Sequence, residues 1–526
     1  MATQLAEREL RSVNPATLEV VGTVPAAGPA DVAEAAAHAA EAAERWRREP
    51  LDRRRELVRR VRDVLLDQQD EVAATVVAET GKPVAEAYAT DLLLTAEQLR
   101  WLARNAHQVL APRALRIGIP YLLHKRARVV YEPLGVVGVI APWNFPLAIG
   151  FSQTAAAVAA GNAVVLKPSE LSPLTGAWIG RAFADAGAPE GLVSVIQGDG
   201  AVGAALVRAP HVAKIVFTGS PSTGARVAVA AAELLRPVTL ELGSKDPMIV
   251  LDDADLERAA AGAVWGSFAN CGQICVGIER ILVARPLYDT FVSELAQRAR
   301  ALRIGRGDEP GTDLGPLVSE RQRDHVEDLV ADALEHGADA VTGARRPAVP
   351  LPGWFYEPTV LVGTSRNARI EREEVFGPVV TVRPFDSEAE AVEIANEQPF
   401  GLGASVWTRD GDRARRLASR LEVGMVWTND VGWTYGSGAP WGGTKQSGHG
   451  RLHGEHGLYE LSHIKVVDED SGRVPVPWWY PYDDRTVDGF KGVLETLHRE
   501  SLRERALGYW RHRRGLRRLA RRYLSK

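Results

Sequence analysis

The chain of 526 residues is poor in sulfur, with only two cysteines and three methionines. Cys271 and Cys275 cannot build the disulfide framework of a small secreted protein, so we expect a reducing, cytoplasmic environment. Their spacing of four residues is not a usual zinc-binding pattern, and no Cys/His pair follows to complete four ligands. We therefore predict no metal site.

The sequence also lacks the patterns of a secretory signal and of a membrane span. Residues 7–9 are charged, where a signal peptide would have its apolar core. Residues 133–166 carry no charge and are long enough to cross a bilayer, but Pro142, Pro146 and Asn162 lie inside them. A strand, loop, helix and strand buried in an α/β core is the better interpretation.

Charge is small in total, at −4, but unevenly distributed. Residues 499–526 carry eleven basic residues against Glu500 and Glu504, a net +9 that leaves −13 elsewhere. Apolar residues at helical spacing predict a basic amphipathic segment: Leu502, Ala506, Tyr509, Leu516, Ala520 and Tyr523. We expect it either to contact an anionic membrane surface at the inner face of the membrane or to dock on a neighbouring subunit. The acidic body argues against nucleic acid as a partner.

Short runs rich in Val and Ile alternate with helical stretches along most of the chain. Five runs lie between residues 136 and 243, and six more between 248 and 430. This alternation indicates βαβ units, so the predicted fold class is α/β with parallel sheets. Residues 31–47, with Asp31 as N-cap, and 53–74 are predicted helices, and 121–131 an edge hairpin.

The sequence contains polar residues in motifs that accompany Cys275, which an ordinary buried cysteine would not require. Asn144 lies in a Pro-bounded turn after one predicted strand, Glu241 ends another, and Glu374 lies in a third strand-to-loop element, residues 373–378. Seven motifs occur in order: PWNFP, LKPSE, FTGSPSTG, ELGSKDP, GQIC, EEVFGP and GGTKQSGHGR. Together with the 34 residues between Glu241 and Cys275, they resemble the non-acylating aldehyde dehydrogenase superfamily over about residues 12–470.

This resemblance implies a Rossmann-like cofactor-binding domain and an α/β catalytic domain with a bridging oligomerisation hairpin. We expect the hairpin and a late strand to pair between subunits of a homodimer or homotetramer. The implied boundaries are 8–116 and 137–242 for the NAD-binding domain, 243–445 for the catalytic domain, 117–136 and 456–474 for the bridging segment, and 475–526 for the basic extension.

For the chemistry, the resemblance implies oxidation of an aldehyde to a carboxylic acid. Cys275 is the implied nucleophile, which forms a thiohemiacetal and then a thioester. The Asn144 side chain and the Cys275 backbone N–H are the implied oxyanion donors, and Glu241 the general base for hydrolysis. Glu241 argues against the coenzyme-A-acylating branch. A non-catalytic NAD-binding scaffold is the alternative class, and the intact set of three residues argues against it.

The implied cofactor is NAD, with NADP as the alternative. A carboxylate at Glu170, beside the adenosine ribose, would repel a 2′-phosphate. Ser244 stands where the family usually has a glycine, so the nicotinamide environment is expected to differ. The cofactor residues implied by the resemblance are Trp143, Lys167, Glu170, Gly219, Ser220, Gly224, Leu242, Glu374 and Phe376.

The implied substrate tunnel is mostly apolar and aromatic. It consists of Phe145, Ile149, Ser152, Gln153, Trp433, Tyr435 and Trp441. We therefore narrowly favour a medium-chain, long-chain or aromatic aldehyde. Many succinate-semialdehyde dehydrogenases have an arginine at the position of Ser152, where it pairs with the distal carboxylate of the substrate. The serine makes succinate semialdehyde a less favoured substrate, and we keep it as the alternative. Cys271 is expected to be an inert buried thiol, with reversible oxidation as the other interpretation.

Overall fold

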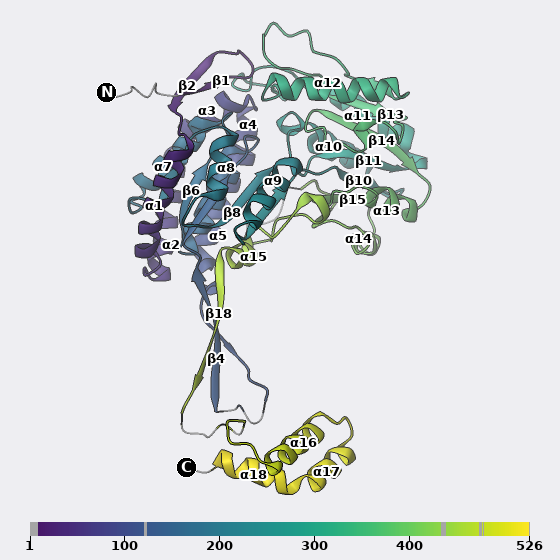
Figure 1. Cartoon of the computed structure of the whole chain (residues 1–526). Helices are drawn as coiled ribbons and strands as arrows, with labels where there is room; N and C mark the ends of the chain where they lie inside the picture. Colours follow the sequence, from purple (N-terminus) through teal and green to yellow (C-terminus); the bar gives the residue numbers. More distant parts are fainter. Residues whose placement is uncertain are drawn as a thin grey trace, which may run out of the picture. The chain divides into compact units, whose positions relative to one another are not determined.

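A computed structural model describes residues 9–119, 122, 124–432, 438–472, 476 and 478–524. The chain forms two compact units. The larger one comprises residues 1–110 and 132–463, and the smaller one residues 111–131 and 464–526. The larger unit is built on two mainly parallel sheets (Figure 1).

The first sheet has six strands, all parallel except the outer strand β17. Its order is β17 (Gly448–His449), β9 (Val238–Leu242), β8 (Val212–Gly219), β5 (Val136–Ile140), β6 (Ala163–Lys167) and β7 (Val193–Val195). The register of β8 and β9 sets Thr218 beside Glu241 and Gly219 beside Leu242. The carboxyl ends of these strands meet at one edge, where ligands of parallel sheets bind.

Helices surround this sheet (Figure 1). They are α1 (Pro29–Trp46), α2 (Leu51–Asp67), α3 (Gln69–Thr80), α5 (Leu93–Val109), α6 (Pro146–Ala159), α7 (Pro173–Asp185), α8 (Gly200–Arg208) and α9 (Pro221–Ala232). Helix α6 is buried on almost every side and contacts α5 and α7. This position explains why residues 133–166 lack charge: they form β5, α6 and β6 in the interior. None of the described helices is long and apolar enough to cross a bilayer.

The second sheet has seven strands, parallel except for the outer strand β12. Its order is β12 (Asp339–Thr342), β13 (Thr359–Val362), β14 (Val379–Phe385), β11 (Ile278–Ala284), β10 (Asp246–Val250), β15 (Gly403–Trp407) and β16 (Met425–Thr428). Its helices are α10 (Leu256–Phe268), α11 (Tyr288–Arg300), α12 (Glu320–Glu335), α13 (Glu388–Asn396) and α14 (Gly411–Ala418).

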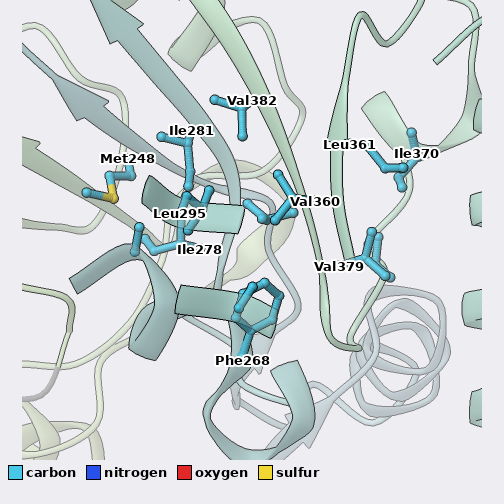
Figure 2. Close-up of a cluster of buried hydrophobic side chains, with 14 of the residues drawn as sticks. Met248, Phe268, Ile278, Ile281, Leu295, Val360, Leu361, Ile370, Val379 and Val382 are labelled. Atoms are coloured by element: carbon cyan, nitrogen blue, oxygen red, sulfur yellow. The ribbon is translucent and has the colours of Figure 1, made fainter. Parts of the chain in front are cut away.

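Both faces of this sheet are buried. Met248 of β10 belongs to one hydrophobic cluster with Phe268 of α10 and Leu295 of α11 (Figure 2). The neighbouring residue Ile249 belongs to another cluster, with Ile394 of α13 and residues of α14. Successive strand residues point to opposite faces, so two-sided burial requires the continuous apolar runs seen in the sequence.

Short elements complete the larger unit. They are β1 (Glu9–Val13), β2 (Val20–Pro25), α4 (Val84–Glu86), α15 (Gly454–Glu460), a π-helical turn η1 (Ala87–Leu92) and the 3-10 turns η3 (Ala269–Gly272), η4 (Arg285–Leu287), η5 (Arg369–Glu371) and η6 (Lys445–Ser447). Strands β1 and β2 pair antiparallel.

The smaller unit contains a three-stranded sheet in the order β18 (Ser462–Asp470), β4 (Lys125–Pro133) and β3 (Arg113–Leu115). Its three helices are α16 (Asp484–His498), α17 (Leu502–Arg511) and α18 (Arg513–Leu524), and α16 contacts both others. The α16–α18 crossing is close, because a Cβ atom on Gly489 would lie 2.6 Å from the Gly515 carbonyl oxygen.

The predicted α/β fold class is confirmed, and each of the eleven predicted runs contains a strand. Three local predictions were wrong. Helix α1 is capped by Gly28, while Asp31 lies at position N3 and accepts a hydrogen bond from the Gly28 N–H at 2.6 Å. The predicted helix 53–74 is divided at Gln68. The basic segment forms two helices, and the apolar side of α18 packs partly on α16, where Leu516 meets Gly492.

Candidate active site

The Cys275 segment follows α10 through a strained loop. Asn270 and Cys271 have φ angles of 51° and 56°, in the left-handed region that non-glycine residues rarely adopt. Gly272 has a φ of 72°, and a Cβ atom there would lie 2.0 Å from the Gly377 carbonyl oxygen. Hydrogen bonds hold this shape: the Asn270 backbone N–H donates to Glu86 at 2.8 Å. Cys275 follows this loop and is half-buried.

Glu241, the fourth residue of β9, lies beside this cysteine. The Glu241 carboxylate accepts hydrogen bonds from the Trp441 Nε1–H, at 3.3 Å, and from the Cys275 thiol. Burial raises the pKa of Glu241 to about 7. Burial, and then the negative charge of Glu241, raise the pKa of Cys275 well above its ordinary value. The proton between the two groups therefore stays on sulfur while Glu241 is charged.

Asn144 is fixed at both its side chain and its backbone. It is buried in the turn before α6, and its Nδ2 donates to the Gln273 carbonyl oxygen at 3.1 Å. Its own carbonyl oxygen accepts from Lys82 Nζ at 2.8 Å and from Asn270 Nδ2 at 3.0 Å. These contacts join the Asn144 turn to the Cys275 loop.

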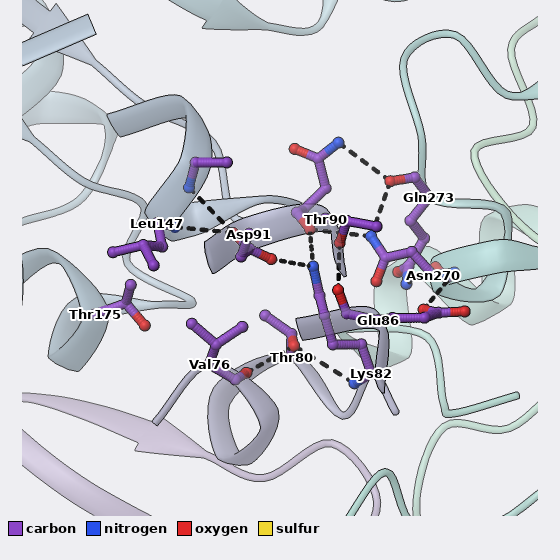
Figure 3. A network of polar contacts seen from close by, with 12 residues as sticks. Val76, Thr80, Lys82, Glu86, Thr90, Asp91, Leu147, Thr175, Asn270 and Gln273 are labelled. Atoms are coloured by element: carbon purple, nitrogen blue, oxygen red, sulfur yellow. Dashed lines mark hydrogen bonds and ion pairs between the residues drawn. The ribbon is translucent and has the colours of Figure 1, made fainter. Parts of the chain in front are cut away.

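A buried ion pair lies behind this junction (Figure 3). Lys82 Nζ and Asp91 Oδ2 are 2.7 Å apart, and neither side chain has any exposed surface. The second oxygen of Asp91 accepts from the backbone N–H groups of Leu147 and Ala148, at 3.2 and 3.1 Å. Asp91 therefore satisfies the first turn of α6, whose own N-cap, Phe145, provides no side-chain hydrogen bond.

Sequence reasoning missed this network. Lys82, Glu86 and Asp91 follow one another within ten residues, and that spacing of charges was the available signal. Burial raises the pKa of Glu86 to about 7. The partners of Lys82 and Glu86 include Asn144 and Asn270, which lie far away in the chain.

Several residues implied as cofactor ligands lie at the carboxyl ends of parallel strands. Lys167 ends β6, and its Nζ is 2.9 Å from Glu170 Oε2. Gly219 ends β8, and Ser220 caps α9. A Cβ atom on Gly224 would lie 2.5 Å from the Leu242 side chain, so glycine allows α9 to pack closely on β9. The arrangement leaves the N-terminus of α9 at the edge of the sheet, where such termini favour anions.

The other implied ligands meet across the two sheets. Trp143 and Phe376 pack edge to face, with ring centroids 5.5 Å apart. Glu374 accepts a hydrogen bond from the Ser244 backbone N–H at 2.8 Å, and a Cβ atom on Gly243 would lie 2.1 Å from its carboxylate. Ser244, which stands where the family usually has a glycine, donates a hydrogen bond from its hydroxyl to Asp246.

A cavity of about 100 Å³ contains both Cys275 and Glu241. The predicted tunnel residues Phe145, Ile149, Ser152, Gln153 and Trp441 line it, whereas Trp433 and Tyr435 lie outside the described residues. The remaining lining residues were not predicted. They are Thr90, Leu94, Gln98, Ala148, Thr218, Ile274, Val276, Gly432, Leu452 and His453.

Gln98 could have been recognised from its position in α5. It lies one helical turn after Leu94 and one before Leu102, in an apolar stripe where a polar residue is unexpected. Cys271, by contrast, belongs to the same hydrophobic cluster as Met248 and Phe268. Burial raises the pKa of its thiol, which favours an inert cysteine.

Comparison with known proteins agrees with this architecture. The model of the aldehyde dehydrogenase family matches residues 2–467. The 2-hydroxymuconic semialdehyde dehydrogenase of Pseudomonas sp. (strain CF600) is 40% identical over 468 residues, which are 88% of this chain and 96% of that protein. The match to the family model ends before α16.

Solved structures are similar over the same region. The NAD+ complex of an aldehyde dehydrogenase from Bacillus cereus has a TM-score of 0.85 at 36% identity, covering 88% of this chain and 94% of that one. An E. coli NADP-dependent enzyme has a TM-score of 0.84 at 34% identity, covering 88% and 95%. The family match and these similarities show that the chain is an oxidoreductase that acts on aldehydes. The chain belongs to the aldehyde dehydrogenase family.

The buried ion pair generates a stability prediction. Lys82→Met leaves the Asp91 carboxylate buried without its cation, so we expect a loss of about 3–5 kcal/mol in the free energy of unfolding. Urea unfolding followed by tryptophan fluorescence measures it. The control is Arg208→Met, which removes an exposed pair with Glu233 and should change stability little. Equal stabilities of the two variants would contradict the assignment.

Proposed function

We propose that the chain oxidises an aldehyde to a carboxylic acid through a covalent intermediate on Cys275. The observation that carries this proposal is the contact of the Cys275 thiol with the Glu241 carboxylate at one cavity. Asn144 does not line this cavity, but its hydrogen bond to the Gln273 carbonyl oxygen joins it to the Cys275 loop, and Lys82 holds its backbone. Nucleophile, base and amide donor are the groups that acyl transfer requires.

The first half of the reaction forms the carbon–sulfur bond. Glu241 takes the thiol proton as sulfur adds to the carbonyl carbon, and the C=O electron pair moves to oxygen. One N–H of Asn144 is bonded to Gln273, and the other can donate to this oxyanion together with the Cys275 backbone N–H. When bound, the nicotinamide supplies the acceptor for the hydride that leaves the same carbon, and a thioester remains on Cys275.

The second half of the reaction hydrolyses the thioester. Glu241 first releases the thiol proton to solvent and becomes a carboxylate again. It then takes a proton from water as the water oxygen attacks the thioester carbon. The C–S bond breaks, the carboxylic acid leaves, and Glu241 returns this proton to the sulfur. A base with a pKa near 7 suits this task, because it is available at neutral pH and still basic enough to act.

The cofactor proposed is NAD in preference to NADP. Lys167 and Glu170 would hold the adenosine ribose, and Glu170 would repel a 2′-phosphate. The N-terminus of α9, from Gly219 to Gly224, would meet the pyrophosphate. Trp143, Leu242, Glu374 and Phe376 would surround the nicotinamide ribose. The close packing that Gly224 and Gly243 permit supports this assignment, since a Cβ at either position would clash. The six-stranded sheet with its helices is the proposed cofactor domain, and the seven-stranded sheet the catalytic domain.

The cavity lining favours an aromatic or apolar aldehyde over a semialdehyde with a second carboxylate. Phe145, Ile149, Ile274, Val276 and Trp441 supply apolar surface. Lysine and arginine are absent from the described lining, so an anionic substrate would have no partner there. A semialdehyde, as in the name of the Pseudomonas relative, remains the second candidate.

Replacing the base tests the mechanism. In Glu241→Gln we expect a first phase of about one NADH per active site that is slower than in the wild type, because the thiol lacks its proton acceptor. Steady turnover should be slower still, by about 100-fold or more relative to the wild type, because hydrolysis also lacks its base. Stopped-flow absorbance measures both phases. In the wild type, the steady rate should rise with pH through about 7, as Glu241 loses its proton, and this dependence should vanish in the variant.

Cys275→Ala is the matched control and should show neither this first phase nor turnover. Turnover by Cys275→Ala would overturn the covalent mechanism. Tight binding of NAD without oxidation of any aldehyde by the wild type would instead indicate a non-catalytic scaffold.

We propose that the chain assembles into a homodimer or homotetramer through β18. This outer strand exposes Ile464 and Val466, with 65% and 59% of their surfaces accessible. Apolar side chains on an edge strand favour pairing with another chain.

Light scattering at micromolar concentration should therefore give at least twice the chain mass of 57.0 kDa. The double substitution of Ile464 and Val466 by Asp should give monomer, because charge would be buried at the interface. Leu235→Asp, at a residue with 94% of its surface exposed, is the control and should keep the assembly. A monomeric wild type would refute the proposal.

The basic extension is proposed to contact anionic lipid at the cytoplasmic face of a membrane. Arg513, Arg514, Arg517 and Arg521 are exposed along α18, and Trp510 of α17 exposes 61% of its surface. Arginine with exposed aromatic groups suits an anionic interface. Docking on the acidic body of another subunit is the alternative.

Co-sedimentation with vesicles decides between them. The full chain should bind vesicles containing phosphatidylserine at low salt and lose binding as salt screens the charge. Neutral vesicles, and a chain truncated after Val474, are the controls and should show little binding. Equal sedimentation of the full and truncated chains would leave subunit docking as the better account.

A further inference from the structure

The catalytic cavity has a polar wall that the proposed chemistry does not use. Gln98 is 2% exposed, and neither its amide nitrogen nor its amide oxygen has a hydrogen-bond partner among the described residues. Gln153 is 4% exposed; its nitrogen donates to Thr218 at 2.9 Å, while its oxygen has no partner there. Both side chains line the cavity that contains Cys275. Buried amides without partners are costly, so a partner must exist in the functional state.

The position of this wall follows from helix geometry. Phe145, Leu94 and Ile149 pack in one hydrophobic cluster with Cys275. Gln98 follows Leu94 by four residues on α5, and Gln153 follows Ile149 by four residues on α6. Each amide thus lies one helical turn, about 5.4 Å, beyond the residue that packs beside the nucleophile. The polar wall faces the part of a substrate remote from its aldehyde.

His453 and Ser152 complete this wall. His453 precedes α15 with a φ of 58°, an unusual conformation for a residue with a side chain, and its ring lies 6.3 Å from that of Trp441. Burial lowers the pKa of His453 to about 4, so the imidazole is neutral at pH 7. Glu241 is the only charged group in the described lining. The wall can therefore donate and accept hydrogen bonds without carrying charge.

A substrate that enters must replace the hydrogen bonds that water would make with these groups. They line both the catalytic cavity of about 100 Å³ and an adjoining cavity of about 20 Å³. The Gln98 amide offers two N–H groups and two lone pairs, and the Gln153 oxygen adds two more. An apolar substrate end that displaced the water would leave them unpaired, which costs affinity.

We propose that the substrate is a compact aldehyde, aromatic or short-chain, that carries a neutral hydrogen-bonding group such as a hydroxyl at its distal end, recognised by Gln98 with Gln153 and His453. This inference rests on the proposed aldehyde oxidation and adds its substrate class. The apolar walls, Phe145 and Trp441 among them, hold the body of the molecule. A distal carboxylate or quaternary ammonium group would find no countercharge at this wall.

Matched substrates test the proposal. 4-(Hydroxymethyl)benzaldehyde and 4-ethylbenzaldehyde have nearly the same size, and they differ in the distal hydroxyl. We expect the wild type to favour the hydroxyl compound at least tenfold in kcat/KM, because the ethyl group leaves Gln98 unpaired. 4-Formylbenzoate should be poorer than both. In Gln98→Met the preference between the first two should disappear or reverse, because kcat/KM falls for the hydroxyl compound and does not fall for 4-ethylbenzaldehyde.

Gln398→Met is the matched control. Gln398 is also a buried glutamine whose side-chain oxygen has no partner among the described residues, and it does not line the catalytic cavity. Its replacement should leave the substrate preference unchanged. Urea unfolding completes the comparison: Gln98→Met should be at least as stable as the wild type, because it removes unpaired polar atoms. A clear loss of stability would mean that Gln98 has a structural partner, and would overturn the proposal.

Binding to Cys275→Ala separates this proposal from the proposed function. Calorimetry with that variant should give a Kd at least tenfold lower for the hydroxyl compound than for 4-ethylbenzaldehyde, and Gln98→Met in the same background should remove the difference. Equal kcat/KM or equal Kd values for the two compounds would refute the polar wall while leaving aldehyde oxidation intact. Oxidation of neither aldehyde, with the Kd difference kept, would refute the proposed function alone.

Discussion

The Lys82–Asp91 ion pair is the contact on which the arrangement of the site depends. Two fully buried charges are stable only with each other and with further hydrogen bonds. Here the further bonds go to the Asn144 carbonyl oxygen and to the first turn of α6. One pair therefore fixes the turn that carries the amide and the helix that lines the cavity. Nearby, Asn144 and Glu86 also bind Asn270, so the strained Cys275 loop is tied to the same network.

Burial also sets the protonation of the site. Removing Glu241 from water weakens its acidity, and the same desolvation keeps a proton on Cys275. Glu241, with a pKa of about 7, can exchange its proton near neutral pH, whereas Cys275 keeps its proton until Glu241 accepts it during attack on the substrate. The apolar enclosure that favours the body of the substrate is thus also the source of the acid–base behaviour.

Much of the fold could be predicted because its signal is local. Runs of Val and Ile predicted eleven of the thirteen strands in the two large sheets, since a parallel strand buried on both faces must be apolar throughout; the two that were missed, β12 and β17, are antiparallel outer strands. Helix ends were less predictable. Asp31 is a good N-cap by type, yet Pro29 begins α1 earlier and Asp31 instead bonds to Gly28. The basic segment is amphipathic by spacing, but it forms two helices, α17 and α18, and both pack on α16.

For the site, the sequence by itself determined the family and the chemical types of the key residues, because motifs keep order and spacing along the chain. The motifs identify Cys275, Glu241 and five further residues that line the cavity. The tertiary structure alone decided which groups meet: Lys82 with Asp91, Trp143 with Phe376, and Gln98 with the catalytic cavity. The reason is physical. A residue's type is local, but burial and pairing, which shift pKa values and leave Gln98 without a partner, are created only when distant segments pack together.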